Sequence, residues 1–224
     1  MKARNPCLPL LQRKECLVPT WRGWLVLLFT FAIVSAVAIR GAYGFLAPND
    51  PLPGGLLVVE GWASDQIMAS TLDEYRRNHY EGVLTTGGPV ELGGALHNYK
   101  TYADLGRATL IQMGMNPDVP KAVPAEAVVR DRTHASATAL KKWLREHGVV
   151  AQKINIMGSG AHSRRTRLIY EKAFQGNMKI GITTSRELEF DPKRWWTSSQ
   201  GVRIVLGESI AYLYARLFFW PAKE

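Results

Sequence analysis

The longest apolar run in the chain extends from Gly23 to Ile39, seventeen residues without a charged side chain. A helix of this length approaches the thickness of a bilayer core, and residues 41–46 lengthen it beyond Arg40, whose side chain can reach the interface. Aromatic residues of the kind found at membrane interfaces flank the run: Trp21, Trp24 and Tyr43. We therefore expect a transmembrane signal-anchor helix over residues 23–46, preceded by a basic tail over residues 1–22.

The rest of the chain alternates short apolar runs with amphipathic stretches. Residues 47–55, with three prolines and two glycines, are expected to form a linker after the anchor. Short apolar runs predict five strands, at residues 56–60, 82–85, 121–129, 153–157 and 178–183. Apolar positions three and four residues apart predict five helices, at residues 64–78, 96–113, 133–147, 161–174 and 199–219.

This alternation predicts an α/β fold for residues 56–224: a Rossmann-like, three-layer domain with a mostly parallel five-stranded sheet, preceded by one transmembrane helix. Strand–helix–strand units build parallel sheets that helices cover on both faces. In such sheets ligands bind beyond the carboxyl ends of the strands. The turns that leave the strands are therefore where we look for functional residues.

The distribution of basic residues predicts how the anchor is oriented. Five basic residues precede the apolar run, and only Arg40 follows it closely. By the positive-inside rule the N-terminus is then cytoplasmic, and the domain lies on the periplasmic or extracellular side of the inner (plasma) membrane. A cleaved signal peptide is the alternative, because Ala36-Val37-Ala38 is similar to a cleavage site, but the 22-residue lead-in and Arg40 favour the anchor. Both alternatives place the domain outside the cytoplasm.

Charge and cysteine content exclude several classes of protein. The formal net charge is +9, but residues 1–46 hold six basic residues and one acidic residue, so the remainder carries only +4. Nucleic acid is therefore not an expected partner. The two cysteines, Cys7 and Cys16, both precede the apolar run, which excludes a disulfide framework in the domain. The histidines lack ligand spacing and no Walker loop occurs, so neither a metal nor a cofactor is expected.

The turn after the fourth expected strand carries the richest set of polar groups. Residues 158–160 (Gly-Ser-Gly) lead into a helix whose free N–H groups favour an anion, although such a turn can also be purely structural. On that helix His162 and Arg165 fall at the site edge, whereas Arg164 and Arg167 point to solvent. A proton donor beside a guanidinium suits phosphate or another oxyanion, and a structural core histidine is the alternative.

Three other turns supply further candidates. Glu60 ends an otherwise apolar strand, so we expect its carboxylate at the site edge, to orient the histidine or to act as a base. Arg132 offers a second guanidinium, with Asp131 and Thr133 beside it; Thr133 as a helix N-cap is the structural alternative. Gly87–Gly88 either let a ligand approach the backbone or form a plain turn.

At these residues the chain resembles the DUF218 family, which includes the ElyC, SanA and YdcF proteins. The features that match are Leu-Val-Val-Glu60-Gly-Trp62, Thr-Thr-Gly87-Gly88, Asp131-Arg132-Thr133, His162-Ser-Arg-Arg165 and Glu208, over roughly residues 55–219. The resemblance implies a Rossmann-like envelope protein, often membrane-anchored, linked to cell-wall precursor or lipid-carrier metabolism. Cytoplasmic relatives bind S-adenosylmethionine, which the expected topology disfavours as a ligand here.

These considerations give one set of candidate site residues. We expect His162, Arg165 and Glu60 to be catalytic, and Gly87, Gly88, Asp131, Arg132, Thr133, Gly158, Ser159, Gly160 and Glu208 to bind the ligand. The leading hypothesis is a protein that acts on an anionic small-molecule or lipid-linked envelope precursor at the membrane; a non-catalytic binding module is the alternative. The closing residues Phe218–Trp220 either pack on the sheet or rest on the membrane surface.

Overall fold

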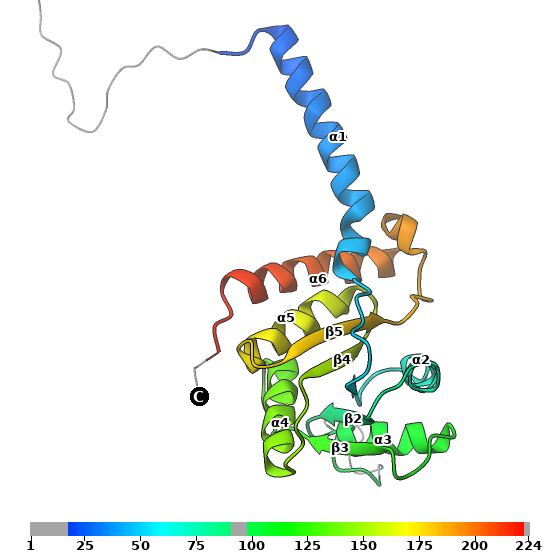
Figure 1. Ribbon diagram of the computed structural model, residues 1–224. Helices are drawn as coiled ribbons and strands as arrows, with labels where there is room; N and C mark the ends of the chain where they lie inside the picture. Colours follow the sequence, from blue (N-terminus) through cyan, green and yellow to red (C-terminus); the bar gives the residue numbers. More distant parts are fainter. Residues whose placement is uncertain (1–17, 91–97, 222–224) are drawn as a thin grey trace, which may run out of the picture. The chain divides into compact units, whose positions relative to one another are not determined.

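A computed structural model describes residues 18–90 and 98–221, so the first 17 residues of the expected tail, with Cys7 and Cys16, lie outside the described residues. The chain divides into two compact units, one ending at Ile39 and one beginning at Arg40. In chain order the elements are α1 (Trp21–Leu46), β1 (Leu56–Glu60), α2 (Asp65–Arg77), β2 (Gly82–Gly87), α3 (Tyr102–Gln112), β3 (Pro120–Pro124), α4 (Arg132–Glu146), β4 (Lys153–Gly158), the 3₁₀ helix η2 (Gly160–His162), α5 (Ser163–Phe174), β5 (Lys179–Thr184), the 3₁₀ helix η3 (Pro192–Thr197) and α6 (Ser199–Leu217) (Figure 1).

Helix α1 is long and apolar enough to cross a membrane. Its most apolar 18-residue window has a mean hydropathy of 2.2, and no residue of that window is buried. Large side chains such as Phe29 and Phe31 are about seven-tenths exposed, which a soluble helix would avoid. The helix expected over residues 23–46 is therefore present, and its surface is suited to lipid.

The five strands form one sheet in which every pair of neighbours is parallel, in the order β3-β2-β1-β4-β5. The predicted α/β, Rossmann-like fold is thus confirmed. Strand β1 lies in the middle, and all five of its residues are buried, which explains its uninterrupted Leu-Leu-Val-Val sequence. The order of strands along the sheet reverses between β1 and β4, and ligands bind at such a switch point in open parallel sheets.

Alternate side chains of the strands enter two separate apolar layers. Val58 and Ile156 pack with Leu140 of α4 and Tyr170 of α5 on one face of the sheet. On the opposite face, Leu57 and Val59 of β1 pack with residues of α2 and α3, among them Met68 and Leu110. Because successive side chains of a strand point to opposite faces of the sheet, helices pack on both faces and form the predicted three layers.

A third apolar cluster joins α6 to the last turns of α1. Leu46 is buried together with Ala161, Trp195 and Val205, and Phe45 meets Tyr212 of α6 edge to face at 5.4 Å between ring centroids. Arg164 donates from Nε to the carbonyl of Phe45 and stacks on its ring, although the sequence placed this arginine in solvent. The C-terminal end of α1, from Arg40 onward, is therefore part of the domain.

The segment expected to be a linker, residues 47–55, lies extended along the domain and is held by hydrogen bonds. Asp50 exchanges backbone hydrogen bonds with Ile182 of β5 at 2.8 and 3.1 Å. Asn155, fully buried in β4, accepts from Leu52 N at 2.7 Å and donates to the carbonyls of Leu52 and Gly54 at 2.9 Å each. A polar residue in a central strand thereby fixes the chain between the anchor and the sheet, so this segment is not a free tether.

Some boundaries differ from those expected. Strand β3 ends at Pro124 rather than Val129, because proline has no N–H to continue a ladder. Helix α4 begins one residue earlier, at Arg132, after Asp131 in a left-handed conformation, so Thr133 lies inside the first turn instead of capping it. Helix α3 begins at Tyr102 after the N-cap Thr101, so residues 98–101 are not helical, and residues 96–97 of the expected helix lie outside the described residues.

We expect Asn155→Ala to destabilise the protein by about 3 kcal/mol, at roughly 1 kcal/mol for each of the three hydrogen bonds that its side chain makes. The melting temperature of the full-length protein in detergent measures the effect. Asn177→Ala, in the exposed turn after α5, is the matched control and should leave the melting temperature unchanged. Equal melting temperatures for the two variants would show that residues 47–55 are not held by Asn155.

Candidate functional site

A pocket of about 1250 Å³ opens at the carboxyl edge of the sheet, next to the switch point between β1 and β4. The turns after β1, β2, β3 and β4 all contribute to its wall, as do the start of α5 and the inner face of α6. Ten of the twelve candidate residues line it: Gly87, Gly88, Asp131, Arg132, Thr133, Ser159, Gly160, His162, Arg165 and Glu208. The other two, Glu60 and Gly158, are the last residues of β1 and β4 and do not line the pocket.

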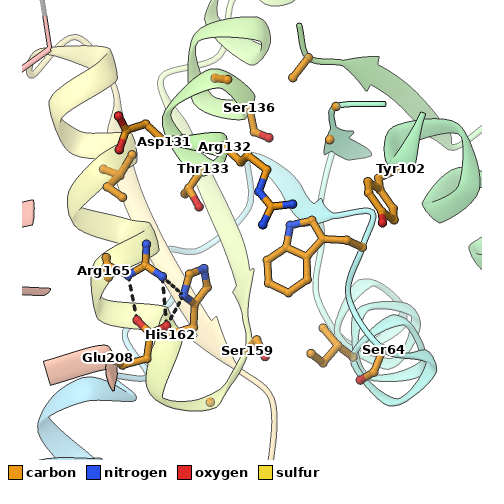
Figure 2. Close-up of a pocket in the computed structure, with 18 of the residues that line it drawn as sticks. Ser64, Tyr102, Asp131, Arg132, Thr133, Ser136, Ser159, His162, Arg165 and Glu208 are labelled. Carbon is orange, nitrogen blue, oxygen red and sulfur yellow. Dashed lines mark hydrogen bonds and ion pairs between the residues drawn. The ribbon is translucent and has the colours of Figure 1, made fainter. Parts of the chain in front are cut away.

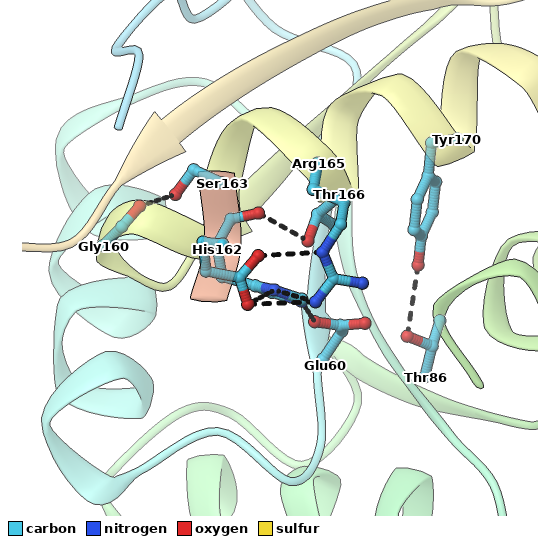
Figure 3. A network of polar contacts seen from close by, with 9 residues as sticks. Glu60, Thr86, Gly160, His162, Ser163, Arg165, Thr166 and Tyr170 are labelled. Carbon is cyan, nitrogen blue, oxygen red and sulfur yellow. Dashed lines mark hydrogen bonds and ion pairs between the residues drawn. The ribbon is translucent and has the colours of Figure 1, made fainter. Parts of the chain in front are cut away.

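An array of four ionisable side chains closes one side of the pocket. Arg165 binds Glu208 through two parallel contacts, Nε to Oε2 at 2.8 Å and Nη2 to Oε1 at 3.0 Å. His162 Nδ1 lies 3.1 Å from the same Oε1, and its Nε2 lies 3.6 Å from Glu60 Oε2 (Figures 2 and 3). The array thus joins β1, η2, α5 and α6, which are distant in sequence.

The two carboxylates hold His162 in its charged form. Burial by itself lowers the pKa of the imidazole, but hydrogen bonding to Glu208 and the nearby charge of Glu60 outweigh burial and raise it to about 9. Burial likewise raises the pKa of Glu208, and the contacts from His162 and Arg165 outweigh it, so that this pKa falls to about 2. At neutral pH His162 is therefore an imidazolium and Glu208 a carboxylate.

This charge state settles an ambiguity at Nδ1, which lies 2.8 Å from Arg165 Nη2 as well as 3.1 Å from Glu208 Oε1. A guanidinium can only donate, and a protonated Nδ1 can only donate, so both groups donate to the carboxylate of Glu208. Glu208 thus occupies Nε and Nη2 of Arg165. Among the contacts of the described residues, Nη1 is the guanidinium nitrogen left to meet a ligand.

The sequence led us to expect the carboxylate of Glu60 at the site edge. In the structure Glu60 is instead buried next to His162, with only 6% of its surface exposed. The reason is its position at the end of the central strand, where it pairs with Thr86 of β2 and lies 3.6 Å from His162 Nε2. Its Oε1 has no hydrogen-bond partner among the described residues, and neither does His162 Nε2. Fully buried Tyr170 lies close enough for burial and the charge of Glu60 to raise its phenolic pKa.

Arg132 supplies a second guanidinium to the pocket. It projects from the first turn of α4 into the space that His162 and Arg165 also line (Figure 2). The left-handed backbone of Asp131, with φ of 60°, precedes it and sets the start of the helix. Buried Thr133 lines the wall beside it, although the sequence assigned that residue a possible capping role.

The glycines of the site have packing roles in addition to lining the pocket. Gly87 has φ of 155°, and a Cβ there would lie 2.7 Å from Cβ of Tyr102, so glycine lets α3 approach the end of β2. Gly160 has φ of 46°, and a Cβ there would lie 2.9 Å from Glu187 Oε2. Gly158 ends β4, and any side chain on it would collide with Ser163.

Several pocket residues were not identified from the sequence. Trp62 is 45% exposed and meets the His162 ring edge to face at 5.7 Å. The position of Trp62 directly after β1 could have identified it as a site residue, since the turn after that strand was expected at the site edge. The charged residues Glu126, Arg130, Arg186, Glu187 and Glu189 come from loops with no motif. Acidic and basic groups are therefore mixed in the wall of the pocket.

No group of three or more His, Cys, Asp or Glu side chains suited to hold a metal ion occurs within residues 18–90 and 98–221. Comparison of the chain with protein-family models and with curated protein sequences finds no match. The functional assignment therefore depends on the geometry of the pocket.

The array makes the stability of the protein depend on pH in a defined direction. His162 has a folded pKa of about 9, above its ordinary 6.5, so its contribution is complete below pH 6.5 and is lost as the pH rises through 9. Glu208 has a folded pKa of about 2, below its ordinary 4.5, so its contribution is complete above pH 4.5 and is lost as the pH falls toward 2. Both contributions are complete between pH 4.5 and 6.5.

We therefore expect the destabilisation caused by His162→Gln to be largest near pH 6 and to shrink, by an amount on the order of 3 kcal/mol, as the pH rises to about 10. Melting temperatures of the wild type and the variant across this range measure it. His147→Gln, an exposed histidine at the end of α4, should show no such trend. A pH-independent difference for His162→Gln would contradict the charged state of His162.

Proposed function

We propose that this chain is a membrane-anchored envelope protein of the DUF218 type that binds, or acts on, an anionic cell-wall or lipid-carrier precursor. The observation that supports this most directly is the convergence of three cationic side chains, His162, Arg165 and Arg132, on one pocket at the switch point of a parallel sheet. Guanidinium groups are the preferred protein partners of phosphate because of their planar, multiple donors.

The volume of the pocket is consistent with a ligand larger than a phosphate ion. About 1250 Å³ exceeds the usual size of a site for a small metabolite. Trp62 offers a half-exposed ring beside the cationic groups, and Tyr102 and Pro89 add further apolar surface. A phosphate attached to a sugar or to an isoprenoid chain would match this combination of cationic and apolar walls.

The proposed location follows from α1 and the charges around it. We place the N-terminus in the cytoplasm and the pocket outside it, because five basic residues precede the span and Arg40 alone follows it closely. In that compartment the pocket meets lipid-linked envelope precursors and not nucleotide cofactors.

A non-catalytic binding module is the second candidate, and the geometry of His162 favours it. Both ring nitrogens face carboxylates, and Nε2 is enclosed above Glu60. A proton from His162 can reach a ligand only through Glu208, which lines the pocket, or after the ring turns. The array in this arrangement is better suited to holding a charged group than to direct proton transfer.

We expect Arg132→Gln to weaken binding of a short-chain polyprenyl phosphate by about tenfold to a hundredfold, since a hydrogen bond to a charged group contributes about 1.5–3 kcal/mol. Isothermal titration calorimetry of the full-length protein in detergent measures the affinity. Arg145→Gln, exposed on the last turn of the same helix, is the matched control. Equal affinity for the polyprenol that lacks the phosphate, or no effect of Arg132→Gln, would contradict an anion site.

Release of phosphate from the same probe separates an enzyme from a binding module. If the protein is an enzyme, the wild type turns the probe over and His162→Gln lowers the rate by about 10²–10⁴-fold, the usual contribution of a general acid or base. A binding module retains the probe and forms no product. Turnover that survives in His162→Gln would exclude a catalytic role for this histidine.

A further inference from the structure

We propose that the outer face of α6 lies on the surface of the bilayer that α1 enters. This inference goes beyond ligand binding and depends only on the membrane-anchor part of the proposed function. Four large apolar side chains, at spacings of four, three and four residues, form a stripe on the helix: Leu206, Ile210, Leu213 and Leu217 are 51%, 70%, 54% and 57% exposed. No described element covers them, and an exposed stripe of this kind marks an interaction surface.

The stripe is separate from the face with which α6 packs on the domain. Gly201, Val205 and Ala215 are buried on the inner face, where Tyr212 contacts Phe45. At about 100° per residue the stripe falls on the opposite side of the helix. Only three of the nineteen residues of α6 are charged: Glu208 faces the pocket, Arg216 lies on the flank, and Arg203 lies on the outer side before the stripe begins, so the outer side from Leu206 to Leu217 carries no charged residue. A soluble helix with one buried face has a polar face opposite it.

Tryptophan residues of the kind found at membrane interfaces flank α6 in the sequence, the second of them beside Lys172 of α5. At one end Trp196 is 36% exposed, with the guanidinium of Arg40 at 5.9 Å from its ring. At the other end Trp220 is 77% exposed, with Lys172 Nζ at 4.6 Å from its ring. Tryptophan with a neighbouring basic group suits the headgroup region, where the ring meets the acyl boundary and the cation meets lipid phosphates.

The continuity of the chain identifies the bilayer, rather than a second copy, as the partner. Phe45 and Leu46, the last residues of the apolar helix α1, pack against α6 and its neighbours. Residues 47–55 are held along β5, so no free tether separates the anchor from the domain. A helix that contacts the end of the anchor is thereby confined to the neighbourhood of the membrane surface.

The docked helix also carries a residue of the pocket. Glu208 lies on the inner face of α6, where it binds Arg165 and His162. The diameter of one helix, about 10 Å, then separates the pocket wall from the lipid headgroups. A lipid-linked substrate can occupy the pocket at that distance while its chain stays in the bilayer.

Depth measurements on the full-length chain test the inference. In a background in which Cys7 and Cys16 are replaced by serine, Ile210→Cys or Leu213→Cys carries an environment-sensitive fluorophore, and the protein is placed in nanodiscs of mixed zwitterionic and anionic phospholipid, one copy per disc. We expect both labels to be quenched by lipid-bound nitroxides at a depth of about 5–10 Å and to be shielded from iodide. Gln112→Cys on α3, which packs on the opposite face of the sheet, is the control and should be open to iodide.

Labels on α6 that are as open to iodide as Gln112→Cys would overturn the inference. Shielding that occurs only in vesicles holding many copies, with disulfide formation between Ile210→Cys chains, would show that a second copy covers the stripe and would overturn it equally. The measurement needs no ligand, so failure of polyprenyl phosphate binding leaves its result unchanged, and the two proposals fail separately.

Discussion

The contact on which the rest of the structure depends is the double ion pair between Arg165 and Glu208 (2.8 and 3.0 Å), with His162 on the same carboxylate. It holds α6 to α5 at the point where β4 leaves the sheet. Without it, an arginine, a histidine and two glutamates would be brought together in a partly buried space, which is costly unless each charge is paired. Glu208 pairs with both Arg165 and His162, and this pairing allows the cationic groups to lie at the wall of a pocket and not on an open surface.

The same carboxylate lies close to the end of α1. Glu208 is on the inner face of α6, and Tyr212, four residues later, meets Phe45 at the end of α1. Leu46 is buried next to Ala161, which belongs to the turn that carries His162. The end of α1 and the wall of the pocket therefore share one apolar cluster.

Much of this could be predicted from residue patterns. The apolar run of β1, the alternation of strands and helices and the rule about carboxyl ends of strands place His162, Arg165 and Arg132 around one pocket. The burial of Glu60 was not predicted, because it depends on which strand is central, and strand order is not encoded in local periodicity. The charged loops at residues 126–130 and 186–189 were missed for a similar reason: loop residues reach a pocket through tertiary placement. The segment 47–55 has the composition of a linker, and only the buried Asn155 reveals that it is held.

The arrangement also bears on how an anion can bind next to two carboxylates. The negative charge of Glu208 weakens the attraction of Arg165 for an anion. Glu208 also occupies Nε and Nη2 of the guanidinium and so orients it with Nη1 available. Glu60 keeps His162 charged from below, away from the pocket, so its own charge is screened from a ligand by the imidazolium. Arg132 approaches the pocket from another helix, α4. Under the proposed function, an anion in the pocket meets His162, Arg165 and Arg132 alongside carboxylates of the same wall, such as Glu208, and its charge further favours the protonated form of His162.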